Sequence, residues 1–305
     1  MHVDYFVTGA SGFVGSHLCC ELTKSKRTVV AQVRDVYPTP WGQWLQEALK
    51  NCTLVRGDVT DFHFIKRVIG EYHPKKGVLH LAAQALVATA QRDPVSTFQT
   101  NVGGTINVLE ACSQLNVPTV IQSTDKVYGD NLQATLDSKL VPTEPYGTSK
   151  VCVDMIAQTY RQTYGMPIII TRSCNVYGYD PGNDRIIPNT IKKCIKGEKP
   201  FVFKDEASLR QYVFIDDVCE VFQDLLELAD CAPIVNIGSN TIISQQEVVL
   251  EILKSFPGLS AEYIEKPFLK EIHSQCMGEF VKAKKPTCFS EGIKKTIDQF
   301  VKYGW

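Results

Sequence analysis

The sequence has no long hydrophobic run and no excess of charge of either sign. Its 305 residues carry 32 Lys and Arg against 33 Asp and Glu, so the formal net charge is -1. Such a balance gives no electrostatic reason to expect nucleic acid or an anionic membrane as a partner. No apolar stretch is long enough to span a bilayer, and residues 1–7 run directly into an expected strand. We therefore expect a cytoplasmic protein.

A metal-binding or disulfide pattern is also missing. The eleven cysteines are scattered, and the adjacent Cys19 and Cys20 lie in an expected helix without Cys-x-x-Cys spacing. We expect buried, reduced thiols and no bound metal. Internal repeats, low-complexity segments and flexible linkers are likewise lacking, while a hydrophobic content of 44% suffices for a sizeable core.

Strands and helices alternate through about residue 172. The expected strands begin near residues 5, 28, 53, 78, 117 and 168, and the expected helices include residues 16–23, 94–115 and 147–164. This alternation predicts an α/β fold with a Rossmann-type, doubly wound parallel sheet and right-handed crossovers. Residues 1–172 are expected to form this dinucleotide-binding domain. Residues 173–305 are less regular and are expected to form a smaller region interleaved with it.

A glycine-rich turn follows the first expected strand and leads straight into a helix. In strand-turn-helix context, glycines let the backbone approach a pyrophosphate, whose charge rests on the amino terminus of the helix. A dinucleotide is therefore expected here. The residues expected to bind it are Gly9, Ser11, Gly12, Phe13, Val14 and Gly15.

The second strand ends in two residues that favour different dinucleotides. Asp35 is suited to the ribose hydroxyls of NAD, whereas Arg34 is suited to the 2′-phosphate of NADP. We expect NAD, with NADP as the alternative. Asp58 is placed to receive the adenine amino group, unless it is a solvated loop acid. The expected cofactor site is completed by Val59, Leu81, Ala82 and Ala83.

The polar segment after the fifth strand is the expected catalytic centre. Ser123-Thr-Asp-Lys-Val-Tyr-Gly129 follows the expected strand at 117–122, at the edge where open α/β sheets bind ligands. Tyr146 and Lys150 lie one turn apart at the start of the next helix. An ammonium favours a neighbouring phenolate, so the pKa of Tyr146 is expected to fall toward neutrality, and Tyr146 to take a proton from a substrate hydroxyl. The alternative is an exposed amphipathic helix surface.

Seven segments in order resemble the extended short-chain dehydrogenase/reductase family, in its NAD-dependent epimerase/dehydratase branch. They are Thr8-Gly9-x-x-Gly12-x-x-Gly15, Asp58-x-x-Asp61, His80-Leu-Ala-Ala83, Asn101-x-x-Gly104-Thr105-x-Asn107, Tyr146-x-x-x-Lys150, Arg172-x-x-Asn175-x-Tyr177-Gly178 and Arg210-x-Tyr-Val-x-Ile-Asp-Asp217. The resemblance implies that Thr124 and Tyr146 contact the 4-hydroxyl of a sugar. It also implies that Lys150 holds the nicotinamide ribose and that the region after residue 172 grips a nucleoside diphosphate sugar.

Within this family, the segment 123–129 is similar to that of sugar-nucleotide 4,6-dehydratases. Their usual pattern has glutamate where Lys126 stands, a departure similar to CDP-glucose and certain UDP-sugar dehydratases. Loss of water across C5 and C6 needs an acid for the C6 hydroxyl and a base for the C5 proton. Asp125 is the natural acid, and Lys126 serves as base only if its pKa is depressed. Alternatively, the two residues pair in a surface salt bridge.

The resemblance also implies a set of residues that bind the substrate. Arg185 is expected near the diphosphate, and Arg210 is the better clamp because a guanidinium grips phosphate oxygens bidentately. A surface ion pair with Asp216 or Asp217 is the alternative for Arg210. The complete set is Gln84, Asn175, Arg185, Ile187 and Arg210. Relatives pair through two helices, so we expect a homodimer formed by residues 95–115 and 148–164.

Together these features predict a lyase with a tightly bound nicotinamide cofactor. It would convert a UDP-, CDP- or dTDP-hexose into the 4-keto-6-deoxyhexose by oxidation at C4, loss of water and return of hydride to C6. The catalytic residues would be Thr124, Asp125, Lys126, Tyr146 and Lys150. A 4-epimerase is the alternative, since it needs neither Asp125 nor Lys126. A cofactor-sensing regulator is disfavoured, because a sensor needs no proton acceptor.

Overall fold

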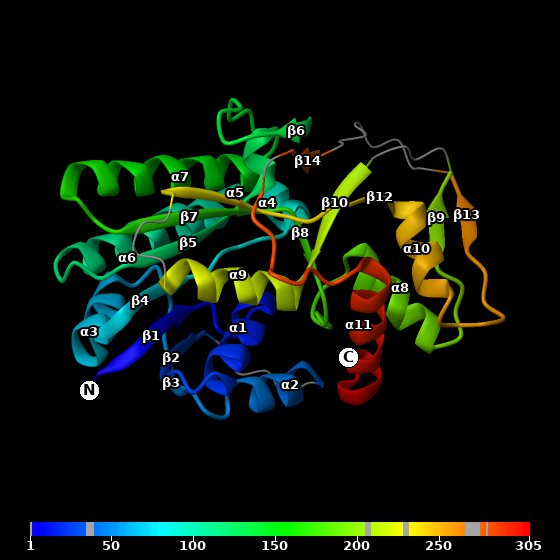
Figure 1. Cartoon of the computed structure of the whole chain (residues 1–305), viewed down its shortest axis with the longest axis horizontal. Helices are drawn as coiled ribbons and strands as arrows, with labels where there is room; N and C mark the ends of the chain where they lie inside the picture. Colours follow the sequence, from blue (N-terminus) through cyan, green and yellow to red (C-terminus); the bar gives the residue numbers. More distant parts are fainter. Residues whose placement is uncertain (1, 35–39, 205–208, 228–231, 266–274, 279) are drawn as a thin grey trace.

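A seven-stranded parallel sheet forms the centre of the molecule (Figure 1). The computed structural model describes residues 2–34, 40–204, 209–227, 232–265, 275–278 and 280–305. The strand order is β11-β7-β5-β4-β1-β2-β3, and neighbouring strands all run parallel. The strands are β1 (Val3–Thr8), β2 (Val29–Val33), β3 (Thr53–Arg56), β4 (Pro74–His80), β5 (Thr119–Thr124), β7 (Ile168–Ser173) and β11 (Ile234–Ile237). This order confirms the predicted Rossmann-type fold.

Helices supply a hydrophobic core to each face of this sheet. One core contains residues of α1 (Phe13–Lys24), α2 (Pro40–Leu49), α9 (Ile215–Glu227) and α11 (Phe289–Tyr303). The other contains residues of α3 (Phe62–Tyr72), α6 (Gly104–Ser113) and α7 (Pro145–Tyr164). In α3 the buried residues recur with helical spacing, as expected for a helix with one apolar stripe. Strand β2 is buried along its whole length, as expected for a central parallel strand.

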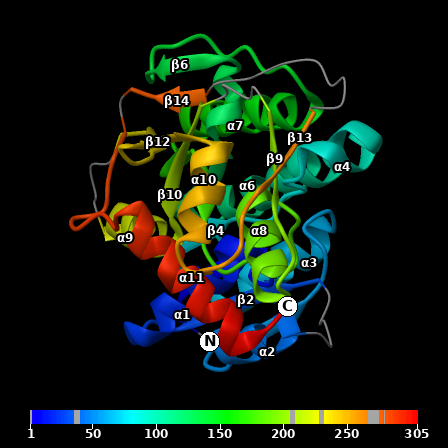
Figure 2. The same ribbon diagram turned by 90° about the vertical axis from the view of Figure 1, so that its right-hand side faces the viewer.

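The chain beyond β7 builds a second, smaller layer (Figure 2). Its five-stranded sheet contains β6 (Asn131–Ala134), β8 (Asn175–Tyr177), β10 (Leu209–Phe214), β12 (Thr241–Ser244) and β14 (Gln275–Met277). A further pair joins β9 (Phe201–Phe203) to β13 (Glu262–Ile264), beside α8 (Ile186–Ile195) and α10 (Gln245–Leu253). Because β11 returns to the edge of the main sheet and β6 joins the smaller one, the two parts of the chain are interleaved.

Two expected elements have different boundaries in the structure. The helix expected over 94–115 consists of α5 (Pro94–Phe98), the π-helical turn η1 (Gln99–Gly103) and α6. Strand β5 extends through Thr124, because Ser123 and Thr124 pair with Arg172 and Ser173 of β7. The polar segment therefore starts within the strand and not after it.

The structure also bears on the absences noted in the sequence. In the part of the chain that the structure describes, no helix combines the length and the apolar character needed to cross a membrane. Among the same residues, no group of three or more His, Cys, Asp or Glu side chains could hold a metal ion. The described cysteines are free thiols. Most of them are buried, and Cys288 is exposed.

Candidate active site

The site forms where the end of β5 meets the start of α7. Thr124 caps the single turn η2 (Asp125–Tyr128), and its Oγ1 accepts a hydrogen bond from the Lys126 amide at 3.3 Å. Glu144 caps α7 through bonds from the amides of Tyr146 (2.7 Å) and Gly147 (2.6 Å). These two caps fix the backbone on either side of the site, and the Thr124 side chain is hydrogen-bonded to the Tyr146 phenol.

The pKa of Tyr146 differs from the prediction. Both side chains are buried. Burial raises the pKa of Tyr146 to about 12, although Arg185 and the hydrogen bond with Thr124 act to lower it. Burial also lowers the pKa of Lys150 to about 8. The predicted fall of the tyrosine pKa toward neutrality is therefore wrong for the protein alone, because removing the phenolate from water outweighs the nearby positive charge.

Lys150 is held in place by the neighbouring strand. Its Nζ donates a hydrogen bond of 2.7 Å to the carbonyl oxygen of Gln122 in β5. This contact ties α7 to the strand that carries Thr124. The ammonium is thereby directed toward the carboxyl edge of the sheet, next to the expected cofactor.

Asp125 is buried, with one oxygen engaged and one without a partner. Its Oδ1 accepts from the Thr124 hydroxyl at 3.1 Å and lies 3.9 Å from Lys126 Nζ. Its Oδ2 is buried and has no hydrogen-bond partner among the described residues. The two side chains therefore form an ion pair, as the alternative supposed, but it is not at the surface, because the side chains of Lys126 and Asp125 are 24% and 4% exposed. Its length of 3.9 Å is too long for a hydrogen bond.

A buried chain of polar side chains, which the sequence did not reveal, links the glycine turn to α7. Thr8 Oγ1 contacts His80 Nδ1 at 2.8 Å, and His80 Nε2 contacts Thr105 Oγ1 at 3.0 Å. The Thr105 hydroxyl donates to the carbonyl of Asn101 at 2.5 Å. Asn101 Nδ2 donates to Ser149 Oγ at 2.9 Å, and Ser149 donates to the carbonyl of Tyr146 at 2.7 Å. Thr8, His80, Asn101 and Thr105 stand in the segments that carry the family resemblance, but the sequence did not predict that their side chains bond one another.

The glycine turn leaves no room for side chains. Gly9 has φ +67°, and a Cβ there would lie 2.7 Å from the Ala82 amide nitrogen. A Cβ on Gly15 would lie 2.2 Å from the carbonyl oxygen of Gly9. Helix α1 begins directly afterwards with neither a capping side chain nor an acidic residue in its first turn. Its first amide groups therefore suit a pyrophosphate, and the turn fits a dinucleotide.

Gln32, which sequence reasoning missed, braces this turn. Its Oε1 accepts from the Gly9 amide at 2.8 Å and its Nε2 donates to the carbonyl of Gly57 at 2.6 Å. The turn is thus tied to the segment before Asp58, another expected cofactor residue. A buried glutamine in an otherwise apolar strand was the signal for this role.

The remaining expected cofactor residues surround this turn. One carboxylate oxygen of Asp58 accepts two hydrogen bonds from Thr60. Val59 is buried, and its carbonyl oxygen accepts a hydrogen bond from Asn107. Residues 81–83 follow β4, where the amides of Leu81 and Ala82 donate to Thr8. Ser11 lies in the turn before α1, and Phe13 and Val14 are the first residues of that helix. Arg34 is exposed at the end of β2. Asp35 lies outside the described residues.

The five expected substrate residues divide into two groups. Arg185 lies close enough to lower the pKa of Tyr146 and donates to the carbonyl of Ala85 at 3.3 Å. Arg210 lies on β10 beside β14, with its charge near Cys276. Asp217, one partner considered for Arg210, is instead bound by Thr287.

The other three side chains are engaged within the fold. Gln84 bonds the backbone of Leu86 in its own loop. Asn175 donates to the carbonyl of Gln211, and Ile187 is buried in the core with 2% exposure. Their role in binding the substrate stays a prediction.

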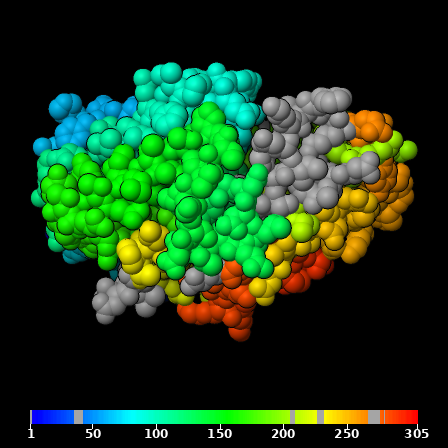
Figure 3. All heavy atoms as spheres, turned by 90° about the horizontal axis from the view of Figure 1, so that it is seen from above, coloured from blue at the N-terminus to red at the C-terminus, as the bar shows by residue number. Residues whose placement is uncertain are grey.

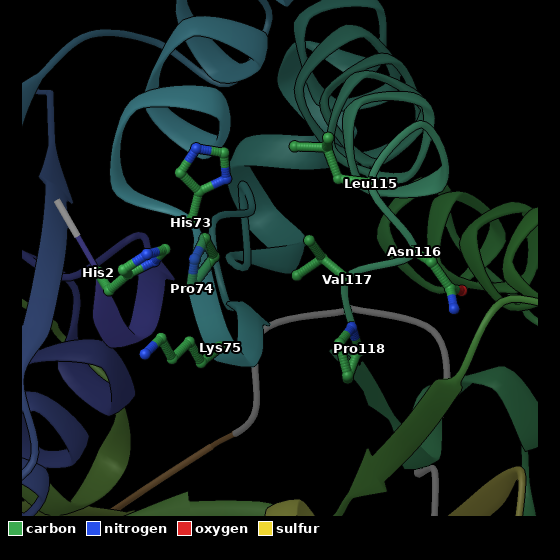
Figure 4. A pocket seen from close by; sticks show the side chains of 8 residues that line it. All are labelled: His2, His73, Pro74, Lys75, Leu115, Asn116, Val117 and Pro118. Atoms are coloured by element: carbon green, nitrogen blue, oxygen red, sulfur yellow. The ribbon is translucent and has the colours of Figure 1, made fainter.

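A surface hollow lies at the opposite edge of the sheet (Figure 4). It is lined by residues at or just before the amino ends of β1, β4 and β5, including His2, Lys75 and Pro118. Parallel sheets bind ligands at the carboxyl ends of their strands, and this hollow lies at the amino ends. It is therefore separate from the site formed by Thr124 and Tyr146.

Comparison with known proteins identifies a family for most of the chain. A sequence model of the family described as "NAD dependent epimerase/dehydratase family" matches residues 5–238. The dTDP-D-glucose 4,6-dehydratase of Mus musculus is 28% identical over 320 residues, which cover 97% of this chain and 88% of that protein.

Solved structures agree with this match. The UDP-glucose 4-epimerase of Thermus thermophilus in complex with NAD is 29% identical, with a TM-score of 0.84 over 99% of both chains. The dTDP-glucose 4,6-dehydratase of Streptomyces venezuelae with NAD bound is 27% identical, with a TM-score of 0.83 over 99% of this chain and 97% of that one. The family match and these complexes confirm the prediction of NAD as the cofactor.

Proposed function

Because the chain belongs to the NAD-dependent epimerase/dehydratase family, we propose that it is a nucleotide-sugar 4,6-dehydratase. The observation that carries this proposal is Asp125. Its buried Oδ2 has no partner among the described residues, and it lies next to Thr124, which is bonded to Tyr146. A buried, unsatisfied carboxylate oxygen costs about 1–3 kcal/mol, so it is well explained by a substrate hydroxyl that it binds. A 4-epimerase needs no acid at this position.

The roles of the residues follow from this placement. Thr124 and Tyr146 hold the 4-hydroxyl, and Tyr146 removes its proton as hydride leaves C4. NAD held at the glycine turn around Gly9 would supply the acceptor, and later the donor, of that hydride. Asp125 protonates the departing C6 hydroxyl, and Lys126 removes the C5 proton, so one water is lost across C5 and C6. Lys126 then returns its proton to C5 as hydride is delivered to C6, and the proton that Tyr146 took from the 4-hydroxyl passes through Thr124 to Asp125. The net change is the loss of one water.

Arg185 and Arg210 support a nucleoside diphosphate as the substrate. Arg210 lies in the smaller sheet and Arg185 near Tyr146, so the two guanidinium groups come from different elements. We infer that Arg210 binds the diphosphate bidentately. Arg185 would stabilise charge that develops on Tyr146, in addition to the diphosphate contact expected from the sequence.

Mass spectrometry of the products tests the proposal directly. The purified protein is incubated with UDP-, CDP-, dTDP- and GDP-hexoses without added cofactor. We expect one of them to lose 18 Da, because dehydration removes one water. A product of unchanged mass with inverted configuration at C4 would support the 4-epimerase alternative, which the Thermus thermophilus neighbour represents.

Variants of Asp125 and Lys126 distinguish dehydration from oxidation. Oxidation at C4 needs neither residue, whereas elimination needs both. In Asp125→Asn and Lys126→Met, the first hydride transfer should proceed and the second should stall, because no C5,C6-unsaturated acceptor forms. Reduced cofactor should accumulate and absorb in the near ultraviolet on mixing with substrate. Wild-type product formation by both variants would favour the epimerase.

A further inference from the structure

A fully buried ion pair lies one helical turn beyond Lys150. Arg172 Nε donates to Asp154 Oδ2 at 2.8 Å, and the two side chains are 2% and 0% exposed. Asp154 follows Lys150 by four residues on α7, so both side chains lie on one face of that helix. Arg172 lies on β7, paired beside Ser123 of β5. The ion pair therefore adjoins both elements that carry the proposed catalytic residues.

Stability alone does not account for this pair. Taking two charges out of water is costly, and replacing a buried ion pair by apolar residues of similar volume is often neutral or stabilising. The carboxylate and the guanidinium nevertheless occupy the centre of the molecule, in contact with the site. This arrangement calls for a role in the chemistry nearby.

Asp154 acts on Lys150 through its charge and not through a direct contact. Asp154 raises the pKa of Lys150, which burial lowers to about 8. Yet the Lys150 ammonium is bound by the carbonyl of Gln122, while the carboxylate of Asp154 is bound by Arg172. Arg172 binds only Asp154 Oδ2, and Oδ1 is buried without a hydrogen-bond partner among the described residues. The positive charge of Arg172 offsets the attraction of the carboxylate for the ammonium, which stays at the Gln122 carbonyl of β5.

Arg172 also holds the turn that carries Asp125 and Lys126. Its NH1 donates to the Tyr128 hydroxyl at 2.8 Å, and its guanidinium lies 5.0 Å from the centre of the Tyr128 ring. The Tyr128 hydroxyl donates in turn to Asn236 Oδ1 at 2.8 Å. One side chain therefore contacts the turn η2 and the carboxylate behind Lys150.

We propose that Asp154 and Arg172 are a positioning pair for the active site: Asp154 keeps Lys150 charged, and Arg172 prevents Lys150 from collapsing onto Asp154. The catalytic use of Lys150 rests on the proposed function, but the effect of the pair on its charge does not. Both residues act through Lys150 and through the turn η2, and neither contacts the reacting atoms.

The other ionisable groups described near Lys150 include His80 and Tyr146, and neither changes its charge in the pH range in which Lys150 titrates. His80 of β4 faces Lys150, and burial lowers its pKa to about 3, so it is neutral above pH 6. Burial raises the pKa of Tyr146 on α7 to about 12, so its phenol is also neutral near pH 8. Asp125 and Arg185 act on that phenol. Asp154 is the charge that raises the pKa of Lys150; burial raises the pKa of Asp154 itself, and Arg172 acts to lower it.

Carbon-13 NMR of ε-labelled lysine measures the Lys150 titration without substrate or turnover. The signal is assigned by its loss in Lys150→Met. In Asp154→Asn we expect the titration midpoint to fall by about one pH unit or more, because an attractive charge is lost and Arg172 becomes uncompensated. In Arg172→Met we expect the midpoint to rise, because Asp154 becomes free to pair with Lys150. A purely structural role would not move the two midpoints in opposite directions.

Conservative variants and kinetics complete the test. Arg172→Lys retains the charge and should restore the wild-type midpoint, and so should Tyr128→Phe, which removes a hydrogen bond and no charge. The alkaline limb of kcat/KM should follow the NMR midpoint in each variant. If Asp154→Asn does not fold, Arg172→Met and Arg172→Lys still give the predicted contrast. Equal midpoints in wild type and either charge-removing variant would overturn the proposal, whether or not the protein is a dehydratase.

Discussion

Tyr146, the proposed proton acceptor, is in surroundings that favour the protonated phenol. Burial raises its pKa to about 12, although Arg185 and the hydrogen bond with Thr124 act against this effect. At neutral pH the phenol of the protein alone is therefore protonated. A spacing of four residues from Lys150 was enough to predict the neighbours but not the outcome, because the burial of both groups depends on strands far away in the sequence.

Replacing Tyr146 by phenylalanine tests its role as the proton acceptor. We expect Tyr146→Phe to lower kcat by at least about 100-fold, the usual contribution of a general base, while the copurifying NAD is retained. Tyr160→Phe is a matched control on the same helix, since its hydroxyl bonds Glu110 away from the site. A kcat of Tyr146→Phe within a few-fold of wild type would remove Tyr146 from the mechanism.

Among the elements, the π-helical turn η1 shows how packing decides details that local sequence does not. Its wider turn places Asn101 so that its amide bonds both the Gln84 backbone and Ser149 of α7. The sequence predicted a single helix at this point, because the partners of Asn101 lie 17 and 48 residues away. The long strands and α7 were predictable, since their burial patterns and caps are local.

The smaller sheet was not predictable for a related reason. Strands β8 and β14 contain three residues each, too few for a periodic pattern. Strand β14 pairs with β10 and β6 at Gln275, which contacts Arg210 and Asn131 in the ladders. Pairings across so many residues are set by the tertiary fold. The expectation that Arg210 binds the substrate therefore rested on the resemblance and not on its local sequence.

Gly103, at the end of η1, and Gly104, at the start of α6, should differ in how alanine substitution changes the stability of the protein. Gly103 and Gly104 both have helical backbone angles. A Cβ on Gly103 meets nothing within 4 Å, whereas a Cβ on Gly104 lies 2.7 Å from Val59 Cγ2. We expect Gly103→Ala to stabilise by up to about 1 kcal/mol and Gly104→Ala to destabilise by about 1–3 kcal/mol. Urea unfolding of the two variants measures this, and equal effects would contradict the packing at Val59.

For the whole molecule, the homodimer predicted from the sequence is open to a direct test. Exposed apolar residues lie on all three helices of the predicted interface: Val95 on α5, Ile106 on α6 and Met155 on α7. Figure 3 shows part of this side of the molecule, where the green segments that include α7 lie beside the cyan segments that include α4 (Val87–Arg92). Such residues are suited to a buried contact between two copies.

We expect a mass in solution of 68.2 kDa, twice the 34.1 kDa of one chain, by light scattering coupled to size exclusion. Met155→Glu should yield the mass of one chain, because it places a charge in the contact. Val301→Glu is the control, since Val301 is 70% exposed on α11, at the opposite side of the molecule (Figures 1 and 2). Wild-type protein that runs as one chain would refute the dimer.

The stability of the whole chain should also depend on pH through a buried histidine. His17 of α1 bonds the carbonyl of Tyr179 at 3.1 Å and packs on Trp44. The bond to Tyr179 joins α1 to the chain beyond β7. Burial lowers the pKa of His17 from 6.5 to about 4. The folded state therefore resists protonation that the unfolded state accepts, so this histidine's contribution is complete above pH 6.5 and is lost as the pH falls toward 4.

From these values, the folded state should lose about 2 kcal/mol through His17 between pH 7 and pH 5. We expect His17→Gln, which keeps a hydrogen-bond donor but cannot titrate, to be less stable than wild type at pH 7 and to lose about 2 kcal/mol less on acidification. Urea unfolding at both pH values gives the four free energies. His80 and the buried carboxyl groups titrate in both proteins, so their effects cancel in the difference. An identical loss in the variant would mean that His17 is already charged in the folded protein.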